Sequence, residues 1–409
     1  MFNINDYKYD EENCYIEVGG ESMMYHCHHY LTNLQKTIYD AEYIDGFMLM
    51  ASCAADAAYY QLSNLCEGLS IEESKQVAQN SYKVFGNGLV DLSAMNEDGI
   101  ELTTTKSILS KTWQMQFGES KKPVDPYTTG FLAAVYGVIY KKNLKDLHIV
   151  QTTEMASGDA FNTHSIRVGE PNITLYPKKS KVAFKPTPKP KSSWEHADLI
   201  TKTFSNANQN FVGNEEGYIP GFGVYVVCNQ SDYVNRVQFE FMKAVEEVAG
   251  EYGTTLAGEL LMQSGLSCGF FTLGGIMSSP EWEGAVKPYL KSTEDWAHAA
   301  IALTNNMGWG YQIITEISKE KMVFRNYTSF EDYSYLKMYG ESDHIVHTAN
   351  SGGWSSLQVL LYESDLVETG KIDTKTMFEE VRKSKFGYKT IRTKGIANGD
   401  DYLEMEVVL

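Results

Sequence analysis

The stretch that decides the fold runs from Gly86 to Tyr140 and reads GNGLVDLSAMNEDGIELTTTKSILSKTWQMQFGESKKPVDPYTTGFLAAVYGVIY. Its pattern returns 222 positions later, from Gly308 to Tyr362, as GWGYQIITEISKEKMVFRNYTSFEDYSYLKMYGESDHIVHTANSGGWSSLQVLLY. The Gly-x-Gly start, the Gly-Glu-Ser triplet and a later glycine fall on the same places. A unit of this length exceeds the repeats of a few tens of residues that build solenoids. The sequence therefore predicts two copies of one domain.

The match extends in both directions with small changes of offset. The turn Ala156 to Asp159 falls on Ala397 to Asp400, and Tyr30 falls on Tyr233. We expect a first domain over 1–175, a linker with a short helix over 176–216, and a second domain over 217–409. The linker is rich in lysine and proline, which favours an extended, stiff segment lying across the surface of one domain.

Each copy follows one order of elements. An alternating segment comes first, then two helices, a third helix that ends at the Gly-x-Gly, a hairpin and another helix. Two strands close the copy around the Ala-x-Gly-Asp turn, over 147–153 and 161–168, and over 389–394 and 402–408. In the first copy the hairpin is expected to turn at residues 96–99. This order predicts an α+β fold with antiparallel sheets covered by helices.

The closing elements resemble those of a known family, the 4-vinyl reductase domain, which is related to the transport-protein-particle and heme-nitric-oxide-binding folds. The matching residues are Gly130-Phe131-Leu132 and Ala156-Ser157-Gly158-Asp159, with Gly352-Gly353-Trp354 and Ala397-Asn398-Gly399-Asp400 in the second copy. The last turn is also similar, more weakly, to that of L-2-amino-thiazoline-4-carboxylate hydrolases. The resemblance implies a small-molecule pocket between helices and sheet, as in sensors of phenolic compounds and some metabolic enzymes.

Many members of that family carry two cysteines around the closing turn that hold a metal. Here Glu154 and Asn162 stand at those places in the first copy, and Gly395 and Leu403 in the second. We expect no metal site of that kind in either copy. The related folds often dimerise, which leaves a homodimer open, or an internal pair in place of one.

Composition narrows the class of partner. The formal net charge of −18 and the pI near 5.0 argue against nucleic acid and anionic membranes as partners, because both need a positive face. No uninterrupted apolar run reaches the ~20 residues of a spanning helix, and the start lacks the pattern of a signal peptide. The six scattered cysteines are expected to be reduced thiols. These features predict a cytoplasmic protein.

The densest group of chemically useful residues is Tyr25-His26-Cys27-His28-His29-Tyr30. If the segment ends a strand, His26 and His28 share one face and Cys27 and His29 the other. A His-x-His pair can place two imidazoles on zinc or iron, with a position left for water. Alternatively, the histidines fill the polar end of a packed junction. A third option is a nucleophilic Cys27 activated by the flanking histidines.

Other candidates lie on both copies. Asp56 stands on an apolar helix face and is a candidate acid or base, with His29 as an alternative proton carrier; a partnered structural role is the competing interpretation. Tyr30, Trp113, Phe117 and Glu119 are candidates for the ligand pocket of the first copy. Trp309 and Trp354 are aromatic candidates in the second. His344 and His347 are a weaker metal pair, and Cys268 stands in a small-residue helix typical of close packing.

The sequence thus predicts that the protein binds a small aromatic or heterocyclic molecule in the first copy and transforms it by hydrolase-like chemistry. The absence of a phosphate-binding glycine loop speaks against nucleotide chemistry. The alternative is a sensor or binding protein without catalytic activity.

Overall fold

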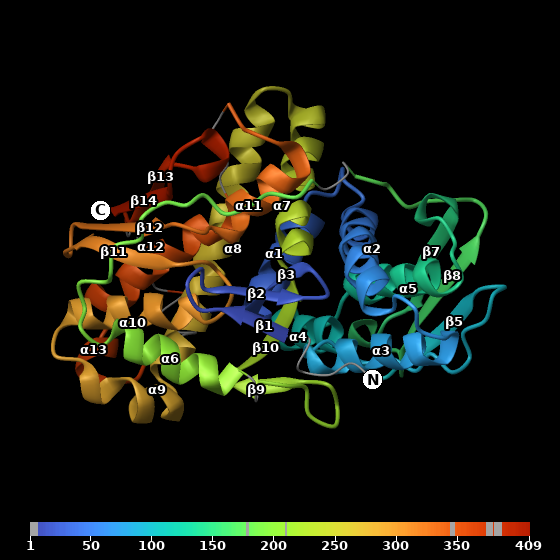
Figure 1. Cartoon of the computed structure of the whole chain (residues 1–409), viewed down its shortest axis with the longest axis horizontal. Coiled ribbons are helices and arrows are strands. Elements are labelled where there is room, and N and C mark those ends of the chain that lie inside the picture. The colour runs from blue at the N-terminus through green and yellow to red at the C-terminus, as the bar shows by residue number, and fades with distance from the viewer. Residues whose placement is uncertain (1–6, 177–179, 209–210, 344–347, 374–378, 380–386) are drawn as a thin grey trace.

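The chain is described by a computed structural model that covers residues 7–176, 180–208, 211–343, 348–373, 379 and 387–409. Helices and antiparallel sheets make up the molecule, which confirms the predicted α+β class (Figure 1). The elements of the first half are β1 (Tyr7–Asp10), β2 (Tyr15–Val18), β3 (Glu21–Cys27), α1 (His28–Asp40), α2 (Gly46–Leu65), α3 (Ile71–Val84), β4 (Gly88–Leu89), β5 (Ile100–Thr104), β6 (Lys106–Ser107), α4 (Ile108–Phe117), α5 (Pro126–Ile139), η2 (Leu144–Asp146), β7 (Leu147–Thr153), η3 (Met155–Ser157) and β8 (Asn162–Val168).

The second half begins after the linker helix α6 (Ala197–Asn208). Its elements are β9 (Ile219–Gly221), β10 (Val224–Gln230), α7 (Ser231–Ala249), α8 (Tyr252–Met277), α9 (Pro280–Ala285), η4 (Lys287–Tyr289), α10 (Thr293–Asn305), β11 (Gln312–Ile317), β12 (Lys321–Asn326), α11 (Phe330–Tyr339), α12 (Ala349–Tyr362), α13 (Leu366–Thr369), β13 (Lys389–Lys394), η5 (Ile396–Asn398) and β14 (Leu403–Val408). The closing strands β7, β8, β13 and β14 lie within one residue of their predicted bounds.

A central sheet joins the two halves. Its strand order is β1-β2-β3-β10-β9, so β3 of the first half pairs with β10 of the second half. Each half also has its own outer sheet, β5-β8-β7 in the first and β11-β12-β14-β13 in the second. Figure 1 shows the central sheet between these two groups. The domain boundaries at 175 and 217 stay a prediction.

The central pairing repeats the same contacts on its two sides. In the β3–β10 register Tyr25 lies opposite Cys228, which is its equivalent in the repeat. The Tyr25 N–H donates to Met307 O at 2.8 Å, and the Cys228 N–H donates to Phe85 O at 2.9 Å. Met307 and Phe85 are again equivalent positions. The residue directly before each Gly-x-Gly therefore accepts a hydrogen bond from a strand of the central sheet.

Glycine is required at Gly86 and Gly308. Their φ angles are +85° and +79°, where side chains are rarely tolerated. A Cβ at Gly86 would lie 2.8 Å from Val226 O, and one at Gly308 would lie 2.4 Å from Met23 O. The backbone passes so close to the central sheet at both places that any side chain would clash.

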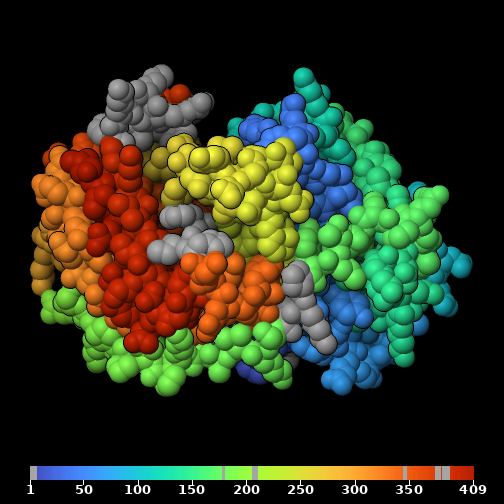
Figure 2. Space-filling model, turned by 90° about the horizontal axis from the view of Figure 1, so that it is seen from above, coloured from blue at the N-terminus to red at the C-terminus, as the bar shows by residue number. Residues whose placement is uncertain are grey.

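The helices also cross between the halves. The long helices α2 and α8 pack on α5 and α12 of their own halves, while α1 packs on α8 and α7 packs on α2. Figure 2 shows α7 and the start of α8, in yellow, between the two halves. Among the described residues α8 alone has the length and apolar composition of a membrane-spanning helix, and 56% of its most apolar window is buried.

One local expectation needs correction. No hairpin forms at residues 96–99, where the described strands show a single bridge, Asn96 to Gly99; β5 instead pairs with the closing strand β8.

The Gly-Glu-Ser triplets make the same contact in both halves. The Ser120 N–H donates to Ala156 O and the Ser342 N–H to Ala397 O, both at 2.8 Å. The triplet thus fastens the loop to the Ala-x-Gly-Asp turn in each half.

The basic linker lies across the second half (Figure 1). Lys185 Nζ donates to Gly399 O and Asp400 O, each at 2.8 Å, and the Tyr311 hydroxyl donates to Pro190 O at 3.0 Å. The Phe184 ring sits edge-on to Tyr333, with 4.6 Å between ring centroids. These contacts hold an extended segment that has few backbone hydrogen bonds of its own.

Candidate functional site

A cavity lies between the first half's α1 and the second half's α8 and α12. The centre of a water molecule can occupy about 40 Å³ of it. A sphere of that volume is roughly 4 Å across, and a water radius of about 1.4 Å on each side brings the width of the cavity to roughly 7 Å, close to that of one aromatic ring. The lining residues are His26, Cys27, Tyr30, Gly265, Cys268, Gly269, Thr272, Leu273, Ile276, Leu303, Thr304, Met307, Trp309, Ala349, Asn350, Gly353 and Trp354.

The lining is mainly aromatic and aliphatic. The rings come from Tyr30, Trp309 and Trp354, and polar atoms come from a few thiol, hydroxyl, amide and imidazole groups. The lining residues include no aspartate, glutamate, lysine or arginine. A charged ligand would lose its hydration on entering the cavity and would find no opposite charge among these residues. The cavity therefore suits an uncharged molecule.

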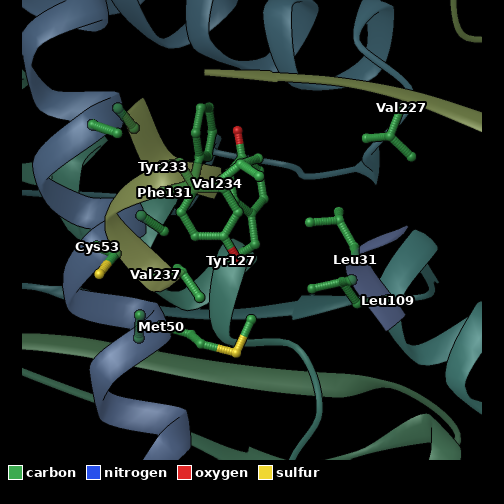
Figure 3. Packing of buried hydrophobic residues seen from close by; sticks show 14 of the residues in the cluster. Leu31, Met50, Cys53, Leu109, Tyr127, Phe131, Val227, Tyr233, Val234 and Val237 are labelled. Atoms are coloured by element: carbon green, nitrogen blue, oxygen red, sulfur yellow. The ribbon is translucent and has the colours of Figure 1, made fainter. Parts of the chain in front are cut away.

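The first half fills the equivalent space with its own rings. Tyr82, Tyr127 and Phe131 stand where the second half has Thr304, Ala349 and Gly353. The Tyr82 and Phe131 ring centroids are 5.0 Å apart, and those of Tyr127 and Tyr233 are 4.9 Å apart. Figure 3 shows Tyr127, Phe131 and Tyr233 packed together beside α2.

The location we predicted therefore needs correction. The cavity lies against helices of the second half, not the first, although three residues of the first half's histidine-rich segment close it. The physical reason is side-chain volume: three rings occupy the first half's space, whereas a threonine, an alanine and a glycine leave it open.

Close helix packing forms one wall of the cavity. A Cβ at Gly265 would lie 1.6 Å from Ala349 O, and one at Gly269 would lie 2.3 Å from Ser356 Oγ. The small residues of α8 thus allow its backbone to touch α12, as their composition indicates. Gly353 differs, since the nearest atom to a Cβ there is Gly265 O at 3.8 Å. A side chain at 353 has space to enter.

The four residues from His26 to His29 do not alternate as a strand. β3 ends at Cys27 and α1 begins at His28, so His26 and His28 do not share a face. Burial lowers the pKa of His26 to about 4, despite hydrogen bonds that favour its charged form. Its ring nitrogens lie 3.1 Å from Cys27 O and 3.0 Å from Asn229 Oδ1. His26 is therefore neutral near pH 7, and its single N–H can donate to only one of these two oxygens.

His28 and His29 are the first two residues of α1. The Tyr225 N–H donates to His28 Nδ1 at 3.1 Å. His29 stacks on Phe271 with 5.3 Å between ring centroids, and its Nδ1 contacts the Gln116 amide. Burial lowers the pKa of His28 to about 4 and that of His29 to about 3. Neither histidine lines the cavity.

The zinc or iron site predicted at His26 and His28 stays a prediction. Both ring nitrogens of His26 and the Nδ1 atom of His28 lie within hydrogen-bond distance of other atoms. Within the described ranges, no three His, Cys, Asp or Glu side chains come together as a metal-binding group would. His344 and His347 lie outside the described residues.

Cys27 stands at the amino end of α1 and faces the cavity. Its Sγ lies 2.5 Å from Thr272 Oγ1 and 3.8 Å from Cys268 Sγ. Burial acts to raise the pKa of this thiol, but hydrogen bonds from Cys268, Thr272 and the backbone N–H groups of Tyr30 and His29 outweigh it, and the pKa is lowered. Burial raises the pKa of Cys268 well above its usual value. The pair therefore combines an acidic thiol with a protonated one.

Gln238 positions the Tyr30 side chain through a hydrogen bond to its hydroxyl group. The Gln238 amide donates to the Tyr30 hydroxyl at 3.3 Å, and Gln238 Oε1 accepts from the Ala349 N–H at 2.7 Å. Glu331 of α11 is fully buried close by, and burial raises its pKa to about 7. Glu331 was not among the residues predicted from the sequence; its only signal there is that the equivalent position of the first half is Leu109.

The remaining predicted site residues lie elsewhere. Asp56 pairs with the buried Arg236 at 2.5 Å, the partnered structural role. Trp113 is buried edge-on to Phe117, with 5.1 Å between centroids, while Phe117 and Glu119 are exposed. None of these four lines the cavity. Of the predicted residues the structure brings together His26, Cys27 and Tyr30, with Trp309 and Trp354.

Comparisons with known proteins add little. No family model matches this chain. No curated protein matches it either. Among solved structures, it is similar to a crystal structure of the phenol-responsive sensory domain of the transcription activator PoxR with phenol, at 15% identity. The match covers 40% of this chain and 85% of that chain, with a TM-score of 0.32. A likeness of this size sets neither the fold nor the ligand, and the resemblance to the 4-vinyl reductase domain stays a prediction.

Proposed function

We propose that the protein binds a small, uncharged organic molecule with a single ring in the cavity between α1, α8 and α12. The observation that carries this proposal is the exchange of three rings in the first half for Thr304, Ala349 and Gly353 in the second. Cores are normally filled to high density, so an opening of ring size at one of two equivalent places favours a ligand in the place of the missing rings.

The polar atoms of the lining favour a ligand with one hydrogen-bonding group. The indole N–H of Trp354 is buried and has no hydrogen-bond partner among the described residues. A ligand oxygen that accepts from it would satisfy a group that is otherwise costly to bury. Phenol has the ring size and the single oxygen, and it serves as a probe. Toluene, which lacks the oxygen, is its matched control.

The expected affinity is modest. A buried ring removes about 200 Å² of apolar surface from water, worth roughly 5 kcal/mol at about 25 cal/mol per Å². Part of this is offset by the entropy of association. Phenol is thus expected to bind with a Kd on the order of 0.1–1 mM, and toluene about five-fold more weakly.

The test fills the cavity from within. Gly353→Phe places a ring where the first half has Phe131, and it should abolish phenol binding in calorimetry while the protein stays folded. Gly284→Phe adds the same ring at an exposed glycine with no atom within 4 Å of its Cβ, and it should bind phenol as the natural protein does. Trp354→Phe should remove the preference for phenol over toluene. If Gly353→Phe binds phenol unchanged, the proposal is wrong.

A second candidate is conversion of the bound molecule, with Cys27 as nucleophile. The observation in its favour is the thiol at the start of α1, whose pKa is lowered despite burial. The thiolate would attack an acyl carbon, expel the alcohol and leave a thioester for water to hydrolyse. Asp56 and His29, the predicted proton carriers, do not line the cavity. Phenyl acetate tests this candidate: phenol should be released by the natural protein and not by Cys27→Ser.

A further inference from the structure

We propose that Cys27 and Cys268 form a peroxide-reactive dithiol, at which a small hydroperoxide is reduced and the two sulfurs join in a disulfide. The site opens on the cavity described above, but the proposal does not need a ring-shaped ligand to bind there. From the sequence Cys268 is expected only to pack, because nothing in the chain order places it near Cys27.

Geometry brings the two thiols into contact. Cys27 ends β3 and Cys268 lies within α8, and their Sγ atoms are 3.8 Å apart. A disulfide requires about 2.05 Å, so the sulfurs must approach by roughly 1.8 Å. Both side chains line an open space, which leaves them room to move.

The surroundings assign different roles to the two sulfurs. Thr272 Oγ1 lies 2.5 Å from Cys27 Sγ and 3.6 Å from Cys268 Sγ, so the hydroxyl favours charge on Cys27. Cys27 also stands at the amino end of the 13-residue helix α1, where backbone N–H groups stabilise an anion. Cys27 is therefore the attacking thiolate, and Cys268 is the second thiol.

The chemistry balances in two steps. The Cys27 thiolate attacks the outer oxygen of a hydroperoxide ROOH, the O–O bond breaks, and the alcohol ROH leaves with a proton taken up from water. Cys27 is then a sulfenic acid. The Cys268 sulfur attacks the Cys27 sulfur, an S–S bond forms, and the hydroxyl leaves as water with the proton of Cys268. One hydroperoxide is reduced for each dithiol that is oxidised.

The size of the cavity selects the oxidant. A space about one ring across has room for hydrogen peroxide or a small organic hydroperoxide, but not for a folded protein or a tripeptide disulfide. The equivalent of Cys27 in the second half is Gln230, and the equivalent of Cys268 in the first half is Asp56, so the repeat holds no second dithiol of this kind.

Four other cysteines of the chain serve as internal controls for the reactivity of Cys27. Cys14, Cys53, Cys66 and Cys228 are also buried and free. Burial raises the pKa of Cys53 and of Cys228, which makes them protonated and slow to react. Reaction at Cys27 can therefore be compared with reaction at these residues within one sample.

The experiment treats the whole reduced protein with hydrogen peroxide and follows each cysteine by peptide mass spectrometry. Six free thiols should fall to four, with a Cys27–Cys268 peptide that has lost two hydrogen atoms. Cys27 should react at least about ten-fold faster than Cys53. In Cys268→Ser, oxidation should stop at a Cys27 sulfenic acid that dimedone traps. In Cys27→Ser, Cys268 should stay reduced.

Thr272→Val provides a variant that keeps both thiols. It should slow Cys27 oxidation several-fold without altering the melting temperature by more than a few degrees. Equal oxidation of Cys27 and Cys53, or a disulfide between other cysteines, overturns the proposal. Phenol binding to the reduced protein is measured separately. If phenol binds but no Cys27–Cys268 disulfide forms, the dithiol proposal is wrong and the binding proposal is unaffected.

Discussion

Removing one ring from the first half should open there the cavity that the second half already has. Phe131 is 2% exposed, lies in the interior of α5, and packs against Tyr82 at 5.0 Å and Tyr127 at 6.3 Å between centroids. It stands at the position of Gly353. Phe131→Ala removes the ring and leaves the helix intact, because alanine is the best helix former.

The expected loss of stability has two parts. Removing the buried ring forfeits about 2–3 kcal/mol of transfer free energy. A residual cavity of roughly 80 Å³ adds about 2 kcal/mol at ~24 cal/mol per Å³. We therefore expect Phe131→Ala to lower the free energy of unfolding by about 4 kcal/mol, which is within the usual range for buried phenylalanine.

Urea unfolding with and without phenol is the assay. Phenol at ten times its Kd should return about 1.4 kcal/mol to the variant through a new site, and calorimetry should count two phenol sites per chain where the natural protein has one. Phe117→Ala is the control, since Phe117 is 36% exposed and should cost less than about 1 kcal/mol. A loss below about 1 kcal/mol in Phe131→Ala, or no gain of a phenol site, would refute the idea that ring volume decides which half is open.

Three further outcomes are expected. Asp56→Asn should destabilise the protein by about 3–5 kcal/mol in urea unfolding, because it leaves Arg236 buried without its counter-charge, whereas Asp40→Asn in the exposed pair with Lys36 should cost less than about 1 kcal/mol; equal effects would show that Asp56 has no structural role. Burial raises the folded-state pKa of Glu331 to about 7, so the folded protein holds a proton that the unfolded chain releases above pH 4.5, and stability falls as pH rises from 4.5 to 7. The free energy of unfolding of Glu331→Gln should not show this fall. The difference in stability between the variant and the natural protein should therefore shift by up to about 3 kcal/mol in favour of the variant between pH 4 and pH 8. An unchanged pH profile would contradict the buried, protonated carboxyl. Elemental analysis should find less than about 0.1 equivalent of zinc or iron, since both His26 nitrogens and His28 Nδ1 lie against hydrogen-bond partners; one equivalent that is lost in His26→Ala would support the predicted metal site.

Much of the local structure could be read from the chain. The closing strands were placed within a residue because alternating side chains on either side of a glycine turn leave few other conformations. The Gly-x-Gly pairs marked where a helix ends in each half, and the structure adds that Gly86 and Gly308 take a positive φ close to the central sheet. The start of α1 was harder to place. Alternation over residues 25–29 suggested a strand, yet the helix begins at His28, because the start of a helix is set by packing as well as by local preference.

The candidate site could be predicted only in part. His26, Cys27 and Tyr30 were identified because unusual side chains gather there, and they do line a cavity. The pairing of Cys27 with Cys268 could not be predicted, since 241 positions separate them and only the crossing of α1 over α8 brings them together. The same holds for Asp56, whose partner Arg236 lies on a helix of the other half.

The sequence by itself determined the α+β class, the repeated order of elements and the residues that carry unusual chemistry, because these depend on side-chain periodicity and backbone limits within short segments. Only the tertiary structure decided in which half the space between the helices that carry these residues is open. That outcome depends on whether rings from separate helices meet in one space: Tyr82, Tyr127 and Phe131 fill it in the first half, while smaller residues leave it empty in the second.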